Sequence, residues 1–317
     1  MRKTISICIP VFNEAANVPL AVRTVEEVFA EQLPEYGLEI IITDNASTDE
    51  SWEIVRRLAS DRPHLKAYRF SRNFGYENSV FAGLSLATGD AAVEVDGDLE
   101  DPPAVIPGFV AKWEEGCDVV YGVRLGRHGS LFRRGLIAVF YKLLGVVSDL
   151  DIPPNSGDFR LLDRRVLDVL KALPERNLFL RGLVSYVGFR QSAVPYRRQP
   201  RASGRSKFHI SEYVRLAFDA FTTFSTKPIE LVAATGFVLL AAVVLLAIVS
   251  AWKHLVFGTP VGGLTALAGL MLLLHGVTFL CLGILGQYLS RVADEGRRRP
   301  RVVIAEAVNS RDHPAWL

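Results

Sequence analysis

The chain of 317 residues is half apolar and 22% charged, with 36 basic and 34 acidic side chains and a net charge of +2. This composition excludes wholesale disorder and a strongly polycationic nucleic-acid binder, so no nucleic-acid partner is expected. The three cysteines, Cys8, Cys117 and Cys281, lie far apart and form neither a CxxC pair nor a Cys/His cluster. Their spacing argues against a disulfide scaffold and against a zinc site.

The first 230 residues alternate patterns that are typical of strands and helices. Helices are predicted near 16–32, 76–87 and 103–115, and Ser47-Thr48-Asp49-Glu50 is interpreted as a capping box that opens another helix through Leu58. The predicted strands are Thr4–Val11, Leu38–Thr43, Leu65–Phe70, Ala91–Asp96 and Asp118–Tyr121. This alternation predicts an α/β fold with a mostly parallel sheet, whose ligands bind at the carboxyl ends of the strands.

An acidic turn follows the fourth predicted strand. Five carboxylates occupy the eight positions 94–101, around Gly97, and without a cation they would repel one another strongly. Hard oxygen ligands of this kind suit Mg²⁺ or Mn²⁺, and either ion would also bridge a diphosphate. The alternative is an acidic surface turn before a helix that begins with proline. Neither a GxGxxG nor a GxxxxGK[ST] phosphate-binding loop occurs in the chain.

Two long uncharged runs dominate the C-terminal part of the chain. Leu231–Trp252 contains no charged side chain, and Leu255–Ser290 contains no Asp, Glu, Lys or Arg and only His275 as a basic group. A membrane-spanning helix needs roughly 20 apolar residues, so both runs are predicted to be transmembrane helices; the alternative is a buried helical hairpin. Five arginines at 291–301, against one lysine in the connecting loop, predict that both termini are cytoplasmic. The expected domains are a cytoplasmic α/β domain at 1–229, a two-helix membrane hairpin at 230–290 and a basic cytoplasmic tail at 291–317.

Motifs in a fixed order along the chain carry a family resemblance. They are Ser6–Glu14, Asp44–Asp49, Ser71–Gly75, Ala87–Asp90, Asp96–Pro103, Asn155–Arg160, Gly204–Lys207 and Arg299–Arg301. The set resembles the inverting, family-two glycosyltransferases of GT-A fold, in the polyprenyl-phosphate branch that includes dolichyl-phosphate mannose synthases and bactoprenol glucosyltransferases. The resemblance covers nearly the whole chain and implies a Rossmann-like GT-A domain followed by two membrane helices.

The resemblance also implies a donor site. The residues that it assigns to the nucleotide sugar are Pro10, Phe12, Asn13, Glu14, Asp44 and Asp96. Asp98 and Glu100 are implied as ligands of a Mg²⁺ or Mn²⁺ ion. The departure from the family pattern is Asn45-Ala46, where Asp-Gly is usual. Because Asn45 brings no charge, its contacts with base or ribose stay open at this stage.

The implied acceptor is a polyprenyl phosphate, whose largely dianionic phosphate needs cationic positioning more than it needs a general base. The candidates to hold that phosphate are Arg124, Arg134, Arg205, Ser206 and Lys207, against the alternative that these side chains are simply solvated. Asp158 is implied as the catalytic carboxylate; its alternatives are a pair with Arg160 or a cap on a helix beginning near Asp163. The amphipathic stretches 131–147 and 210–224 are expected either to lie in the membrane interface or to pack on the sheet.

Together these implications predict an integral-membrane, metal-dependent hexosyltransferase that uses a nucleotide sugar and polyprenyl phosphate at the cytoplasmic face. UDP-glucose is the favoured donor and GDP-mannose the alternative. A catalytically silent membrane scaffold that binds nucleotide sugars is the alternative from another class. A processive polysaccharide synthase is disfavoured because a QxxRW motif is absent. The resemblance further suggests a homotetramer.

Overall fold

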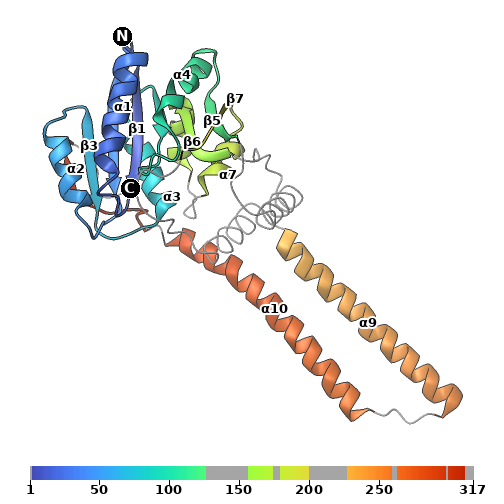
Figure 1. Ribbon diagram of the computed structural model, residues 1–317. Helices are drawn as coiled ribbons and strands as arrows, with labels where there is room; N and C mark the ends of the chain where they lie inside the picture. Colours follow the sequence, from blue (N-terminus) through green and yellow to red (C-terminus); the bar gives the residue numbers. More distant parts are fainter. Residues whose placement is uncertain are drawn as a thin grey trace.

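The computed structural model describes residues 2–125, 156–173, 179–199, 227–258, 263–297 and 299–310. In these residues the strands form an eight-stranded sheet of order β7-β5-β6-β4-β1-β2-β3-β8 (Figure 1). The strands are β1 (Thr4–Val11), β2 (Gly37–Asp44), β3 (Leu65–Phe70), β4 (Ala91–Glu94), β5 (Val119–Arg124), β6 (Ser156–Asp163), β7 (Gln191–Tyr196) and β8 (Ile304–Val308).

Parallel pairing predominates in the sheet. β1 pairs in parallel with β2 and β4, β2 with β3, and β5 with β7. β6 runs antiparallel to β4 and β5, and β8 runs antiparallel to β3. The predicted α/β fold with a mostly parallel sheet is confirmed, and all five predicted strands are present. β4 ends at Glu94, earlier than predicted, because its pairing with β6 stops there.

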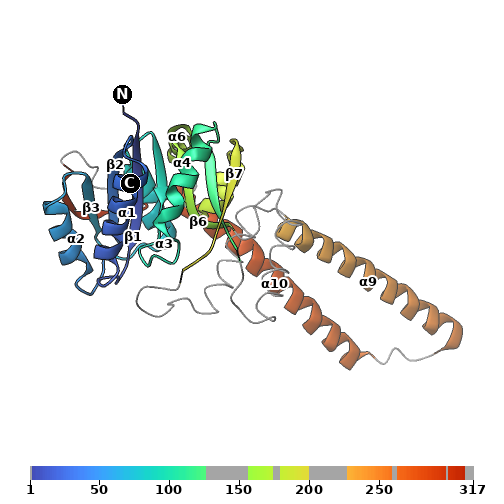
Figure 2. The ribbon, with the colours of Figure 1, turned by 45° about the horizontal axis from the view of Figure 1, so that its top comes forward.

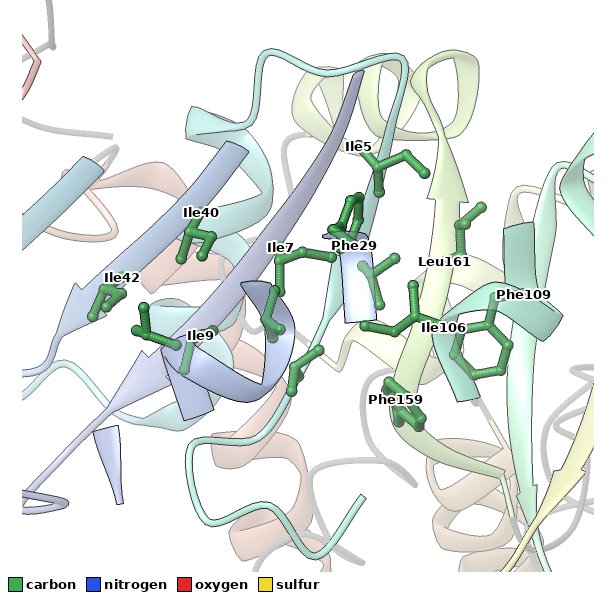
Figure 3. Packing of buried hydrophobic residues seen from close by; sticks show 14 of the residues in the cluster. Ile5, Ile7, Ile9, Phe29, Ile40, Ile42, Ile106, Phe109, Phe159 and Leu161 are labelled. Carbon is green, nitrogen blue, oxygen red and sulfur yellow. The ribbon is translucent and has the colours of Figure 1, made fainter. Parts of the chain in front are cut away.

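Helices cover both faces of the sheet. One face carries α1 (Val18–Gln32), α2 (Ser51–Ser60), the 3-10 turn η1 (Pro103–Val105) and α4 (Ile106–Glu114), and the other carries α3 (Tyr76–Leu86), α6 (Arg164–Ala172) and α7 (Leu180–Tyr186). Successive side chains of a strand point to opposite faces. Ile5 and Ile7 of β1 therefore pack with Phe29 and Ile106 on the first face (Figure 3), whereas Cys8 packs against α3 on the second. Each large apolar side chain buried in this way contributes about 2 kcal/mol.

The predicted capping box is wrong. α2 begins at Ser51 and ends at Ser60. Its N-cap residue Glu50 makes no side-chain cap, and the N–H of Ser51 donates to Asp49 Oδ1 at 3.0 Å. Ser47 Oγ instead accepts the backbone N–H of Asn13 at 2.9 Å. The Ser47 hydroxyl, which the local sequence pattern predicts to cap a helix, is therefore bonded to the loop after β1 instead.

Two long helices, α9 (Lys227–Phe257) and α10 (Leu264–Gly296), leave the α/β domain side by side (Figure 1 and Figure 2). Large apolar side chains on both are exposed, including Trp252 at 66% and Leu289 at 70%. Within the described residues one window, Leu273–Ser290 of α10, is long and apolar enough to cross a membrane. A membrane span in α9 stays a prediction from the uncharged run Leu231–Trp252.

β8 brings the chain back to the sheet after α10. Glu306 of β8 accepts a hydrogen bond from Trp52 Nε1 at 3.1 Å and pairs with Arg69 at 3.3 Å. Asn309 Nδ2 donates to the backbone carbonyls of Arg62 and Leu65 at 3.0 and 2.8 Å. The stretch expected to be only a basic tail therefore contains an edge strand, which ties the end of α10 to the α/β domain.

A buried carboxylate joins three strands at the opposite edge from the loops described below. Glu39 of β2 is 6% exposed. It accepts bonds from Lys66 Nζ on β3 at 2.6 Å, from Thr88 Oγ1 and N at 2.6 and 2.9 Å, and from the Ser6 hydroxyl on β1. Burial opposes ionisation, but these donors, first Lys66, lower the pKa of Glu39 below its ordinary value. Glu39 is therefore ionised and central to the sheet.

We predict that Glu39→Gln destabilises the protein by about 2 kcal/mol at pH 7, because an amide cannot accept from all four donors. The folded-state pKa of Glu39 lies below its unfolded value, so this stability is present above the unfolded pKa and is lost as the pH falls. The difference in thermal midpoint between wild type and variant should thus shrink below about pH 4. Glu27→Gln, at an exposed helix pair with Arg23, is the control and should change little. A pH-independent difference would contradict the assignment.

Candidate active site

One edge of the sheet gathers the loops that carry the predicted site residues. β1, β2 and β4 end at this edge because they are parallel. β6 begins there because it is antiparallel to β4, and β5 ends there because Val123 pairs with Ser156. The topology therefore brings together five separate segments, which carry Asn13, Asp44, Asp96, Arg124 and Asp158.

The loops after β1 and β2 are held together by reciprocal hydrogen bonds. Asn13 has a left-handed backbone, with φ 56°, and its Oδ1 accepts the N–H of Thr48 at 2.8 Å. The N–H of Glu14 donates to Ser51 Oγ at 2.9 Å. Pro10 is buried and Phe12 is half-buried just before this turn. Asn13 is thus a turn residue that fixes the second loop, whereas the start of α1 lies further on, at Val18.

Asp44 closes the second loop from inside. It is fully buried, its carboxylate accepts the N–H of Ser47 at 3.2 Å, and it lies 3.6 Å from Arg69 Nε. Burial raises the pKa of Asp44, although Ser47 and Arg69 oppose the shift. The polar group that sequence reasoning assigned to the nucleotide therefore also holds the loop shape.

The Asn45-Ala46 departure has a structural counterpart. Asn45 Oδ1 accepts the N–H of Phe74 at 2.8 Å, and its Nδ2 donates to Asn73 Oδ1 at 3.1 Å. An amide can do both, whereas an ionised aspartate only accepts. Asn45 therefore ties the end of β2 to the Ser71–Gly75 loop. Ala46 has φ 58°, in the left-handed region where glycine is free of strain.

The acidic loop after β4 forms ion pairs with arginines and accepts a hydrogen bond from a tyrosine. Asp101 is fully buried, pairs with Arg124 Nη2 at 2.9 Å and accepts the Tyr196 hydroxyl at 2.7 Å. Glu100 pairs with Arg198 at 2.6 Å. Asp98 is 8% exposed, and its Oδ1 accepts the N–H of Glu100 at 3.1 Å.

Arg124, a predicted acceptor-phosphate residue, stands between this loop and Asp158. Burial lowers the pKa of Arg124, but Asp101 and Tyr196 raise it above its ordinary value, so the guanidinium is cationic. Gly157 leaves room for it, since a Cβ there would lie 2.7 Å from Arg124 Nη2. The cation is therefore built into the edge of the site by a buried carboxylate on one side and a glycine on the other.

The donor set of the loop fits a hard divalent cation. Among the described residues no group of three or more His, Cys, Asp and Glu side chains forms a preformed metal site. Asp98 and Glu100 offer carboxylate oxygens two positions apart on one loop, a set that suits Mg²⁺ or Mn²⁺ when phosphate oxygens complete the coordination. The pair with Arg198 uses Oε2 of Glu100, so a cation would compete with Arg198 for that oxygen.

Asp158 is clamped by two arginines. Arg181 of α7 donates through Nε and Nη2 at 2.6 and 2.5 Å, and Arg160 Nη2 donates at 3.1 Å. Burial would raise the pKa of Asp158, but Arg181 and then Arg160 lower it well below its ordinary value. Asp158 is therefore a carboxylate. The cap of α6 is Asp163, which accepts the N–H of Arg165 at 2.8 Å.

Sequence reasoning missed four side chains around Asp158. They are Tyr76, Glu77, Glu94 and Arg181, none of which the sequence assigned to the site. Burial and the nearby Asp158 raise the pKa of Glu77 to about 7. One signal was available, because Glu94 is an ionisable residue that ends the otherwise apolar strand β4, and a buried ionisable side chain at a strand end indicates a site.

Four predicted acceptor residues lie outside the described residues, as do the amphipathic stretches 131–147 and 210–224. They are Arg134, Arg205, Ser206 and Lys207. Their assignment stays a prediction from the sequence.

Comparison with known proteins gives a family match and full-length relatives. The profile described as glycosyl transferase family 2 matches residues 6–170. A bactoprenol glucosyl transferase of Shigella phage SfV is 39% identical over 95% of this chain and 97% of its own. An uncharacterized glycosyltransferase of Bacillus subtilis is 38% identical over 95% of this chain and 93% of its own.

A prophage bactoprenol glucosyl transferase homolog of Escherichia coli is 38% identical over 95% of this chain and 98% of its own. Among solved structures, a mannosyltransferase of Pyrobaculum calidifontis in complex with GDP-Man and Mn²⁺ aligns with 92% of this chain and 85% of its own. Its identity is 19% and the TM-score is 0.47. A likeness this distant assigns no residue.

We predict that Ala46→Gly stabilises the folded protein by up to about 1 kcal/mol. The left-handed backbone costs a residue with a Cβ about 1–2 kcal/mol, and glycine loses part of that gain through its larger unfolded-state entropy. Ala46→Val is the matched control, because branching at Cβ worsens the same strain. Thermal midpoints of the purified full chain should rank glycine above alanine above valine. A glycine variant below wild type would contradict the strain.

Proposed function

Because the chain belongs to glycosyl transferase family 2 and is an enzyme that transfers glycosyl groups, we propose that it transfers a hexose from a nucleotide sugar to polyprenyl phosphate. The observation that carries the proposal is the meeting of a carboxylate loop and three arginines around Asp158 at one edge of the sheet. Full-length relatives named bactoprenol glucosyl transferases support the lipid acceptor and favour glucose. UDP-glucose is the first donor to test, and GDP-mannose the second.

The acidic half of the edge is suited to the donor. Asp98 and Glu100 would hold the Mg²⁺ or Mn²⁺ ion, which when bound neutralises charge that develops on the departing diphosphate. Pro10 near the end of β1, Asp44 at the end of β2, and Phe12, Asn13 and Glu14 in the loop after β1 would enclose the nucleotide. Asp96 lies between these loops and Asp158, on the side assigned to the sugar.

The basic half of the edge is suited to the acceptor. A phosphate monoester is largely dianionic near neutral pH, so its oxygen is already a nucleophile. Arg124, joined by Arg134, Arg205, Ser206 and Lys207, would hold this dianion opposite the leaving group, and an attack from that side would invert the configuration of the anomeric carbon. The bond between the phosphate oxygen of the acceptor and the anomeric carbon of the sugar would form as the bond between that carbon and the oxygen of the nucleoside diphosphate breaks.

Asp158 is proposed as the catalytic carboxylate, in an orienting role. Its low pKa makes it a weak proton acceptor, and a dianionic acceptor has little need of one. Its bidentate pair with Arg181 instead fixes positive charge beside the reacting atoms. The alternative, a catalytically silent scaffold, does not require a bidentate ion pair between Asp158 and Arg181.

The membrane assignment rests on the exposed apolar surface of α10 together with the uncharged run in α9. Both helices would cross the bilayer as a hairpin, with residues 1–229 and 291–317 on the cytoplasmic side, where nucleotide sugars are available. The tie between β8 and β3 would then hold the sheet close to the membrane surface. This arrangement supports an acceptor that is itself a lipid.

The test is an assay of the full chain in membranes that contain polyprenyl phosphate, supplied in turn with labelled UDP-glucose, UDP-galactose, UDP-N-acetylglucosamine and GDP-mannose. We expect labelled lipid with UDP-glucose, its loss on adding EDTA and its return with Mn²⁺ or Mg²⁺. Asp98→Asn should reduce transfer by at least about 10²-fold while the protein stays folded and membrane-bound, because it removes a metal ligand.

Glu53→Gln, on the exposed side of α2, is the control for loss of a carboxylate and should transfer as wild type does. Labelled lipid formed only from GDP-mannose would replace the donor but keep the reaction. No labelled lipid from any of the donors, with folded protein, would refute the proposed function.

A further inference from the structure

Tyr76 places one hydroxyl between two carboxylates. Its Oη lies 2.6 Å from Asp96 Oδ1 and 3.1 Å from Glu94 Oε1. Tyr76 is the first residue of α3, whereas Glu94 and Asp96 stand at and just beyond the end of β4. A phenol has one proton, so it can donate fully to only one of these oxygens. If both carboxyl groups were ionised, the phenol proton could be donated to only one of them. The other carboxylate oxygen would then face Tyr76 Oη with no proton between the two oxygens.

Glu94 is the carboxyl group less able to carry a charge. It is 2% exposed, and its Oε2 has no hydrogen-bond partner among the described residues. Burial raises the pKa of Glu94 well above its ordinary value, and the nearby carboxyl groups of Asp158, Asp96 and Glu77 raise it further. Arg160, which pairs with Glu94 in the register of β4 and β6, lowers this pKa but does not cancel the shift. An ionised carboxylate with an orphaned oxygen in this position carries a full desolvation cost, whereas a neutral acid does not.

We propose that Glu94 is held as a neutral carboxylic acid that donates to Tyr76, whose hydroxyl in turn donates to Asp96. The hydrogen bonds Glu94–Tyr76–Asp96 then run in one direction. The carboxyl group of Glu94 donates its proton to Tyr76 Oη, and the phenol proton of Tyr76 is free to be donated to Asp96. One oxygen of Asp96 is thereby fixed, and the other is aimed away from Tyr76. Glu94 and Tyr76 are positioning residues that act through Asp96, and this role rests on the proposed function of Asp96 toward the donor sugar.

The proposal separates two kinds of substitution at Glu94. Glutamine keeps the shape of a neutral acid, and its amide N–H can donate to Tyr76 Oη. Methionine has a similar size and can donate nothing. If Glu94 were instead an ionised ligand of a metal or of the sugar, glutamine would be as harmful as methionine.

The experiment measures donor KM and kcat on the full chain in membranes. Glu94→Gln should keep both within about threefold of wild type, whereas Glu94→Met and Tyr76→Phe should each raise the donor KM about tenfold, the value of one hydrogen bond to a charged group. The double variant Glu94→Met, Tyr76→Phe should have the same donor KM as Tyr76→Phe alone, because both substitutions interrupt the same run of hydrogen bonds. Tyr76→Phe removes a single oxygen from a partly exposed ring, so it tests the proposal even where Glu94→Met fails to fold.

Two controls match these changes elsewhere in the domain. Tyr68→Phe removes a hydroxyl that donates to Ser310 at 2.9 Å and should leave the donor KM unchanged. Glu39→Gln changes an ionised buried glutamate and should lower thermal stability, which Glu94→Gln should not. If the role of Tyr76 were merely structural, Tyr76→Phe would lower the thermal stability of the protein and would not raise the donor KM selectively over kcat.

Infrared spectroscopy reads the proton directly. The wild-type protein near neutral pH should show a carboxylic-acid C=O stretch that is missing in Glu94→Gln. Because this band needs no transfer reaction, failure of the proposed function and failure of the present proposal are separate results. Absence of the band, a Glu94→Gln variant as impaired as Glu94→Met, or a wild-type KM in Tyr76→Phe would each overturn the proposal.

Discussion

The clamp of Asp158 by Arg160 and Arg181 is the interaction on which the rest of the site depends. Asp158, Glu77, Glu94 and Asp96 influence one another's ionisation at a poorly solvated edge of the sheet, where like charges repel strongly. Two guanidinium groups from β6 and α7 balance part of this charge and hold one carboxylate ionised. A buried pair of this kind is costly to break by removing one partner, since the other is left unpaired.

The clamp divides the edge into an acidic and a basic half. Toward β4 and β1 the chain presents carboxylates, which suit a cation that would in turn bind the diphosphate of the proposed donor. Toward β5 it presents Arg124, which Asp101 and Tyr196 hold in place. A transfer between two phosphate-bearing substrates needs both halves side by side, and the antiparallel insertion of β6 between β4 and β5 is what places them so.

Local pattern was enough for the five predicted strands, because runs such as Thr4–Val11 are rich in β-formers and are buried in the centre of the sheet, but it did not identify β6, β7 and β8. It was not enough where a partner comes from far along the chain. The Ser47 hydroxyl bonds to Asn13 rather than to its own helix, and β8 pairs with β3 across more than two hundred intervening residues. The Asp158–Arg181 and Glu94–Tyr76 contacts arise in the same way, from elements that only the sheet topology brings together.

The most direct test of this account is the steady-state kinetics of Asp158→Asn in the full chain, with wild type and Asp163→Asn as references. Asparagine keeps the size of the side chain but removes the charge that holds Arg160 and Arg181. The account predicts a loss of at least about 10²-fold in kcat, as expected when a preorganised charge beside the reacting atoms is removed, with a nearly unchanged donor KM, while Asp163→Asn retains turnover. Near-wild-type turnover of a well-folded Asp158→Asn protein would contradict it.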